Sequence, residues 1–169
     1  HIERIHQEDF CQALGISNTN KYQKYGKGAT LVDCFALLRY CENPQAEAIK
    51  LLQWVIYNIC IGNADAHAKN ISLLYDQKKP RLAPFYDLIS TAPYHWLSQK
   101  LAMKIDDTND GDRIFSSKWK RFAASIGISY ESVCAIGSDL TSNLLNQIDD
   151  ICSRYITQYS YFRELDEIV

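Results

Sequence analysis

The stretch G-N-A-D-A-H-A-K-N, residues 62–70, decides the fold, because it is a polar segment between a helical run and a strand-like run. Residues 46–61 are apolar around nearly the whole helical circumference, which is typical of a helix in the middle of a domain. Residues 71–75, Ile-Ser-Leu-Leu-Tyr, have the composition of a strand. Polar side chains are therefore concentrated where the chain turns, and turns often carry function.

A predicted antiparallel hairpin follows this segment. Residues 76–80 form a charged turn, and residues 81–83 are expected to pair with 71–75 as the second strand. The sequence P-F-Y-D then ends at Asp87. One short hairpin therefore separates Asn70 from Asp87.

Asp65, Asn70 and Asp87 supply the groups that phosphoryl transfer to a hydroxyl requires. These are a carboxylate for the hydroxyl proton and oxygen ligands for the magnesium that neutralises the nucleotide phosphates. The spacing of Asp65 and Asn70 equals that of Asp and Asn in the kinase catalytic loop H-R-D-x-x-x-x-N. In kinases a hairpin likewise follows, and delivers a metal-binding Asp in D-F-G, where this chain has Y-D-L. We predict that Asp65 is the catalytic carboxylate and that Asn70 and Asp87 bind Mg²⁺.

The rest of the chain predicts a mainly α-helical domain that spans residues 1–169. Helices are expected over residues 7–14 and 30–40, with Thr30 as a helix N-cap. After residue 116 the apolar pattern predicts a helix around Trp119, a short helix over 133–136 and a last helix over 140–161.

Composition excludes several classes of protein. The chain has 169 residues, 47% hydrophobic and 22% charged, with a formal net charge of -2, so it has no general basic field for nucleic acid or an anionic membrane. The longest apolar stretches fall short of the ~20 residues that a membrane span needs. Its six cysteines form no C-x-x-C pair and no zinc-finger spacing, a pattern that indicates buried thiols in a reducing compartment. We expect a soluble, cytoplasmic protein.

Several blocks together resemble one known family, the HipA-like serine/threonine kinase toxins of bacterial toxin and antitoxin systems. The matching blocks are R-I-H-Q-E-D-F-C-Q-A-L-G at 4–15, K-Y at 21–22, G-N-A-D-A-H-A-K-N-I-S-L-L at 62–74, L-A-P-F-Y-D-L-I-S-T at 82–91 and K-L-A-M-K-I at 100–105. The resemblance implies the larger, mostly helical lobe of a kinase-like fold, a site for ATP and Mg²⁺, and transfer of phosphate to serine or threonine of a protein substrate. It also implies an antitoxin partner, and through that partner an indirect association with DNA.

The resemblance assigns roles residue by residue. Asp65 is the catalytic aspartate, and Asn70 and Asp87 are the metal ligands. His67 and Lys69 also match the loop motif, where the resemblance implies that they contact the nucleotide phosphates or brace the loop.

The chain departs from the family in what surrounds these acids. Family members are longer, and residues 1–169 contain neither a strand-borne lysine of the V-A-I-K kind nor a G-x-G-x-x-G phosphate loop, because the sequence Gly-Lys-Gly at 26–28 is too short. We therefore expect the chain to be a C-terminal lobe without its upstream small lobe, with weak or no catalysis by itself.

Two other functions compete with a kinase. One is an inactive, kinase-derived interaction module that binds an antitoxin or a separate small-lobe protein. The other is a metal-dependent phosphohydrolase, although such enzymes normally gather more carboxylates around two metals. A small basic cluster, Lys118, Lys120 and Arg121, could approach DNA but is more typical of a solvated helix face.

Overall fold

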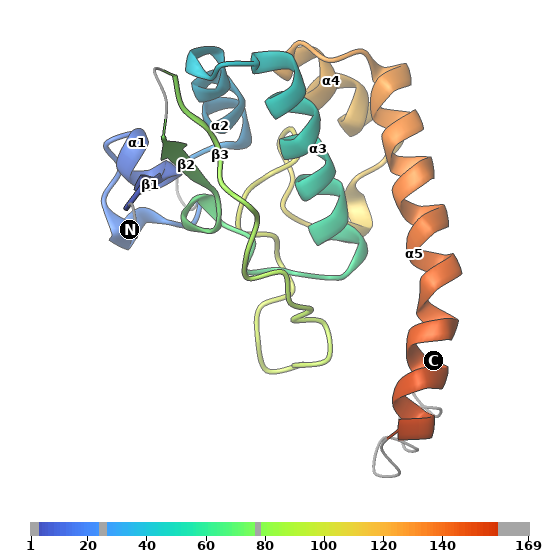
Figure 1. Ribbon diagram of the computed structural model, residues 1–169. Coiled ribbons are helices and arrows are strands. Elements are labelled where there is room, and N and C mark those ends of the chain that lie inside the picture. Colours follow the sequence, from blue (N-terminus) through green and yellow to red (C-terminus); the bar gives the residue numbers. More distant parts are fainter. Residues whose placement is uncertain (1–3, 24–26, 77–78, 159–169) are drawn as a thin grey trace.

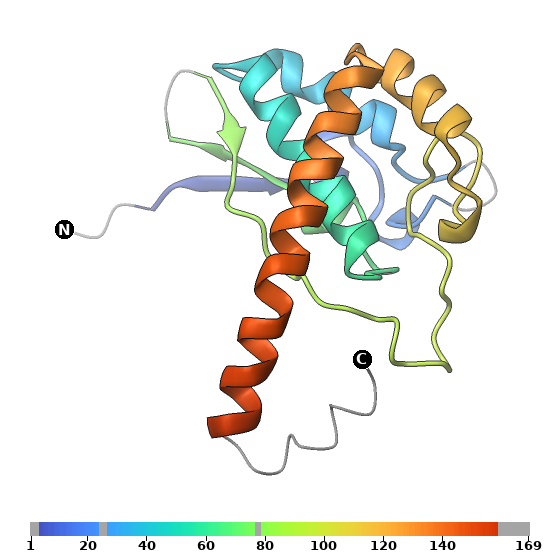
Figure 2. The ribbon, with the colours of Figure 1, turned by 90° about the vertical axis from the view of Figure 1, so that its right-hand side faces the viewer.

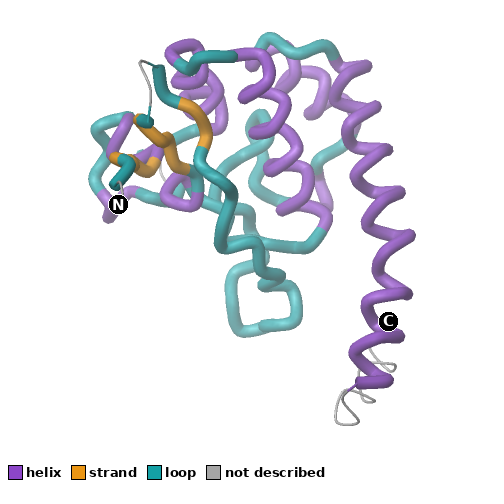
Figure 3. Tube along the Cα trace, in the orientation of Figure 1, coloured by secondary structure: helices purple, strands orange, loops and turns teal. Residues whose placement is uncertain are grey.

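The computed structural model describes residues 4–23, 27–76 and 79–158. It is mainly helical, with a small sheet at one side of a helical body (Figures 1 and 3). The body is made by four helices, α2 (Leu31–Leu37), α3 (Pro44–Cys60), α4 (Ser116–Ile126) and α5 (Tyr130–Gln158). The predicted fold class, a mainly α lobe with a small antiparallel β insert, is confirmed.

The sheet has three strands in the order β1-β2-β3, and both neighbouring pairs are antiparallel. The predicted hairpin is present as β2 (Ser72–Tyr75) and β3 (Arg81–Leu82), with Leu73 opposite Leu82. The third strand, β1 (His6–Asp9), pairs with the other edge of β2.

The helix predicted over residues 7–14 is wrong in its first part. Those residues begin with strand β1, and the helix α1 is confined to Phe10–Ala13. Asp9 is its N-cap, because its carboxylate accepts from the Gln12 N–H at 2.9 Å. The residues before Asp9 pair with β2, because the backbone groups at the edge of that strand need hydrogen-bond partners. This long-range pairing overrides the local helical pattern.

Local signals set the starts of α2 and α3. Thr30 caps α2 as predicted: its hydroxyl accepts from the Asp33 N–H at 3.0 Å, and the Asp33 carboxylate accepts from the Thr30 N–H at 3.0 Å. Helix α3 begins at Pro44, with the Asn43 side chain as its cap. Proline suits the first helical position, where an N–H would have no partner.

The two separate helices predicted over 133–136 and 140–161 are one continuous helix, α5. Gly137, at which the prediction divided them, lies inside α5, and an interior glycine costs only ~1 kcal/mol relative to alanine. Ile136 and Leu140 on either side pack against the core, which offsets that cost. Beyond them α5 continues past the helical body (Figure 2), and residues 159–161 of the prediction lie outside the described residues.

Sheet and helices share one hydrophobic core. Phe10 of α1, Leu52 of α3, Ile71 before β2 and Phe122 of α4 are each almost fully buried in the same cluster. The sheet therefore packs on the helical body through α1, which follows β1, and through the start of β2. Short 3₁₀ helices complete the described structure, at Asn18–Asn20, Leu38–Tyr40, Ala68–Asn70 and Gly111–Arg113.

The expectation of buried thiols is confirmed for three cysteines and is wrong for two others. Cys11, Cys34 and Cys41 are buried, whereas Cys60 and Cys134 are exposed; Cys152 is intermediate, and all six are free. Within the described ranges, none of the helices combines the length and the apolar character that a membrane crossing demands.

Candidate active site

The polar segment 62–70 forms a closed turn between α3 and β2. Gly62 has a left-handed backbone (φ 67°), and the 3₁₀ helix Ala68–Asn70 leads into the strand. Thr91 closes the turn from the other side, because its hydroxyl donates to the Gly62 carbonyl at 3.0 Å and accepts from the Ala64 N–H at 2.8 Å. The chain after Asp87 is thereby held against the loop that carries Asp65.

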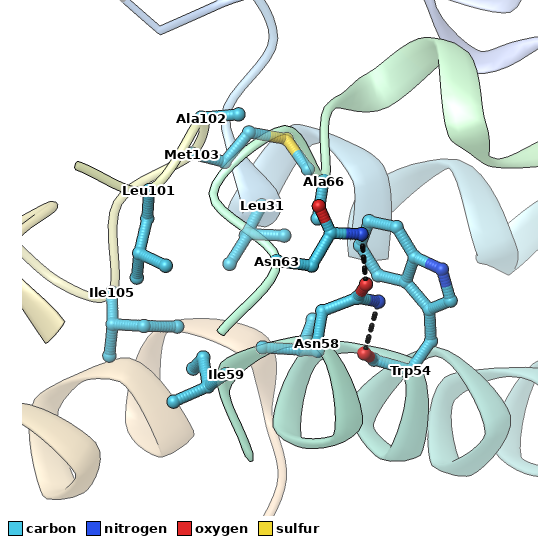
Figure 4. A pocket seen from close by; sticks show the side chains of 11 residues that line it. Leu31, Trp54, Asn58, Ile59, Asn63, Ala66, Leu101, Ala102, Met103 and Ile105 are labelled. Atoms are coloured by element: carbon cyan, nitrogen blue, oxygen red, sulfur yellow. Dashed lines mark hydrogen bonds between the residues drawn. The ribbon is translucent and has the colours of Figure 1, made fainter. Parts of the chain in front are cut away.

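A buried asparagine, Asn63, connects two of the predicted site residues, Asp65 and Asp87. Its amide nitrogen donates to the Asn58 side-chain oxygen at 2.8 Å, a bond drawn in Figure 4, and also to the Asp87 carbonyl at 3.2 Å. Its amide oxygen accepts from the Asp65 N–H at 3.0 Å. Asn58 in turn donates to the Trp54 carbonyl in α3 at 2.8 Å. The backbones of Asp65 and Asp87 are thus fixed to the same helix through one side chain.

Asn70 and Asp87 are in direct contact. The Asn70 amide nitrogen donates to the Asp87 carboxylate at 2.5 Å, and the Asn70 amide oxygen accepts from the His67 N–H at 3.0 Å. Asp87 has a left-handed backbone (φ 58°), a conformation that aspartate tolerates better than most residues. The neighbouring Tyr86 hydroxyl donates to the Lys69 carbonyl, which ties residues 84–87 to the loop a second time.

The donor set of Asn70 and Asp87 suits a magnesium ion. The two residues offer one exposed carboxylate and one amide oxygen that keeps a second lone pair beside its bond to His67. Magnesium commonly binds only one or two protein carboxylates and takes its other ligands from phosphate and water. Among the described residues there is no group of three or more His, Cys, Asp or Glu that could hold a metal.

Asp65 is half exposed, and its side-chain contacts with the described residues involve one carboxylate oxygen. The Tyr22 hydroxyl donates to Asp65 Oδ1 at 2.5 Å, and His67 Nε2 lies 3.9 Å from the same atom. His67 is buried, and its burial, with nearby Lys21, lowers its pKa below the usual 6.5. His67 is therefore neutral at pH 7, and its contact with Asp65 is not an ion pair.

The lowered pKa of His67 predicts a loss of stability in acid. Well above pH 6.5 His67 is neutral in both the folded and the unfolded chain and makes no contribution. Below that value the unfolded chain takes up the proton more readily, so the free energy of unfolding falls by at most about 1.4 kcal/mol per pH unit. Urea unfolding between about pH 7.5 and 5.5 should show this part of the slope disappear in His67→Gln. The exposed His95→Gln is the control, and equal slopes in all three proteins would contradict the assignment.

Lys69 forms an ion pair with Asp9, a residue outside the predicted site. Its ammonium group lies 2.6 Å from the Asp9 carboxylate, and this bond raises the pKa of Lys69. Because Asp9 joins β1 to α1, the ion pair braces the loop against the N-terminal part of the sheet. Of the two roles considered for Lys69, the structure places it in the bracing position, and contact with a phosphate remains a prediction.

A cleft of about 590 Å³ opens beside Asp65. Tyr22 and Asp65 line it on the loop side, and Tyr94, Leu97 and Leu101 line it elsewhere. A smaller, mostly apolar cavity of about 20 Å³ lies under Asn63 and Asn58, in the interior shown in Figure 4. The predicted catalytic carboxylate thus stands at the edge of an open cleft, whereas the amides that hold it face the core.

Four residues of this arrangement were missed by sequence reasoning: Tyr22, Asn58, Asn63 and Thr91. Asn58 did carry a signal, since an amide within the apolar helix 46–61 needs a buried partner. Tyr22 lies 43 positions from Asp65, so no local pattern connects the two.

The family model described as HipA-like C-terminal domain matches residues 1–148. The chain therefore belongs to the family of HipA-like C-terminal domains, as the resemblance implied.

Known relatives agree with this membership. The protein named "Putative kinase Y4mE" of Sinorhizobium fredii is 47% identical over 128 residues, which are 75% of this chain and 30% of that protein. The serine/threonine-protein kinase toxin HipA of Shewanella oneidensis is 37% identical over 137 residues, 75% of this chain and 32% of that protein. The chain thus spans about a third of the length of these curated relatives.

A solved structure agrees in fold. It is the Shewanella oneidensis MR-1 complex of HipA, HipB and operator DNA, with a TM-score of 0.83 and 32% identity. The match covers 88% of this chain and 37% of the chain in that structure. The helical body and sheet described above therefore have the fold of the matching part of that structure.

Proposed function

We propose that this chain forms the larger lobe of a serine/threonine protein kinase of the HipA toxin type, which transfers the ATP γ-phosphoryl group to a protein hydroxyl. The observation that carries the proposal is the meeting of Asn70 and Asp87 at 2.5 Å, with Asp65 held to Asp87 through Asn63. The kinase names of the relatives support it. The cytoplasm is the proposed compartment.

In this mechanism Asp65 is the catalytic base. The acceptor hydroxyl gives its proton to Asp65, its oxygen forms a bond to the γ-phosphorus, and the bond from that phosphorus to the leaving ADP oxygen breaks. Bound Mg²⁺ would neutralise charge on the phosphates. Asp87 and Asn70 would hold that ion, and His67 contributes its backbone N–H to the orientation of Asn70.

Binding of nucleotide by the 169-residue chain is the first test. Titration of ATP with Mg²⁺ in a calorimeter should give heat of binding that disappears without Mg²⁺ and falls at least about tenfold in affinity in Asp87→Asn, because the carboxylate ligand is lost. Asp150→Asn is the matched control, since Asp150 is an exposed carboxylate paired with Arg154 on α5. Equal affinity in wild type and Asp87→Asn would contradict the metal site.

Catalysis is tested in a grafted kinase. We define it as the Shewanella oneidensis HipA kinase toxin in which the segment matching this chain is replaced by this chain. The graft supplies the two thirds of the relative's length that this chain does not span. Transfer of label from γ-labelled ATP to protein is expected. A folded graft without transfer, beside an active Shewanella protein, would contradict the proposal.

The runner-up is an inactive interaction module, and the exposed end of α5 favours it. In the described part of this helix, large apolar side chains are exposed at Leu145, Ile148, Ile151 and Tyr155. Spacings of three and four residues place three of them, 148, 151 and 155, on one helical face. Such a face suits a protein partner. If the chain is such a module, the calorimetric titration with ATP and Mg²⁺ should give no heat of binding.

An antitoxin is the proposed partner, as HipB accompanies HipA in the Shewanella structure. Association with DNA would be indirect, through that antitoxin. The basic cluster on α4 supports an indirect route, because Arg121 is 2.7 Å and Lys118 is 3.7 Å from Asp106, and Lys120 lies over the Tyr130 ring. These internal pairs leave the cluster poorly suited to phosphate contact.

A further inference from the structure

Tyr22 reaches the proposed catalytic base from a distant, well-anchored segment. The next residue, Gln23, donates its N–H to the Ala102 carbonyl at 2.9 Å, and its side-chain oxygen accepts from the Lys104 N–H at 2.9 Å. Gly28 packs closely on the Tyr22 carbonyl, since a Cβ there would lie 2.3 Å from that oxygen. These contacts of Gln23 and Gly28 fix the Tyr22 backbone beside the cleft that Tyr22 lines.

The Tyr22 side chain contacts both Asp65 and His67. Its hydroxyl donates to Asp65 Oδ1 at 2.5 Å, and its ring meets the His67 ring edge-on, with 5.4 Å between centroids and 74° between planes. Both side-chain contacts of the Asp65 carboxylate in the described part of the chain fall on Oδ1. The other carboxylate oxygen is thus the one left for an acceptor hydroxyl.

Resting on the function proposed above, we infer that Tyr22 is a positioning residue for phosphoryl transfer: its hydroxyl holds one oxygen of Asp65 so that the other faces the acceptor. Asp65 is 45% exposed, and a half-exposed carboxylate turns freely unless a partner holds it. Burial and the bond to Asp65 raise the pKa of Tyr22, so the phenol stays a neutral donor at pH 7. The proton of the acceptor goes to Asp65, and Tyr22 keeps its own proton throughout.

If Tyr22 had a purely structural role, the packing of its ring would matter and the loss of its hydroxyl would not change the rate. The Tyr22 ring packs on His67, and this packing survives in Tyr22→Phe, which removes only the hydroxyl. A matched bond exists far from the cleft, where the Tyr75 hydroxyl donates to Glu8 at 2.8 Å. Tyr75→Phe therefore removes the same kind of tyrosine–carboxylate bond without touching Asp65.

The test measures labelling rates of the grafted kinase. Tyr22→Phe should lower the rate at saturating ATP roughly ten- to a hundredfold and leave the ATP concentration for half-maximal rate within about twofold. Tyr75→Phe should leave both values unchanged. In the 169-residue chain, carbon-labelled tyrosine should show by NMR that Asp65→Ala moves the pKa of Tyr22 toward its ordinary range, whereas Asp150→Ala does not.

The outcomes separate this inference from the proposed function. An unchanged rate in Tyr22→Phe, in a graft that loses transfer in Asp65→Asn, overturns the role of Tyr22 alone. If the graft and its Asp65→Asn variant label protein at the same rate, the proposed kinase function itself is overturned. A Tyr22 resonance indifferent to Asp65→Ala removes the contact on which the inference stands, whatever the activity.

Discussion

Asp65→Asn should lower the rate of phosphoryl transfer by the grafted kinase about a thousandfold, which lies within the usual contribution of a general base to the rate. Asparagine has nearly the same shape and can still accept the Tyr22 hydroxyl, so the loop should keep its structure. What it cannot do is take the proton of the acceptor. The measurement is the rate of label transfer from ATP, with the urea midpoint of each variant as a check on folding.

Asp107→Asn is the control for this variant, because Asp107 is an exposed carboxylate that pairs with Lys118 away from the loop. Its labelling rate should equal that of the wild type. A loss of less than about tenfold in Asp65→Asn would mean that another group takes the proton.

Asn63→Leu should destabilise the chain by about 3 kcal/mol, the largest stability effect that we expect from the site. The leucine leaves three buried or half-buried groups without their partner: the Asn58 oxygen, the Asp65 N–H and the Asp87 carbonyl. Each such group costs roughly 1–3 kcal/mol. Urea unfolding of the 169-residue chain measures the change.

Asn146→Leu, on the exposed part of α5, is the matched control and should change the free energy of unfolding by less than about 0.5 kcal/mol. Asn63→Leu should also weaken binding of ATP with Mg²⁺, since Asp87 loses a backbone anchor. A variant as stable as the wild type would show that Asn63 is not the link between the two acids.

Prediction from the sequence succeeded where the signal is local. Thr30 and Asp33 are three positions apart, and the capping box that they form is complete in the structure. The hairpin of residues 71–83 was also predictable, because its strands are joined by a short charged turn. The spacing of Asp65 and Asn70, followed by a hairpin and Asp87, was enough to propose the chemistry.

Prediction failed where a distant partner decides. Residues 7–9 have a helical pattern but pair with β2, more than 60 positions away. The ion pair of Lys69 with Asp9, 60 positions away, could not be read from the sequence either, whereas contact of Lys69 with a phosphate stays a prediction. In both cases the competing partner is invisible to any window of neighbouring residues.

The sequence by itself determined the family, the mainly helical class and the order of the three candidate site residues, because these depend on residue types and short spacings along the chain. The tertiary structure alone decided that Asn63 joins Asp65 to Asp87, that Tyr22 holds Asp65, and that Lys69 braces the sheet. The physical reason is that a hydrogen bond depends on distance and direction in space, and folding of the shared core brings together groups that lie tens of residues apart.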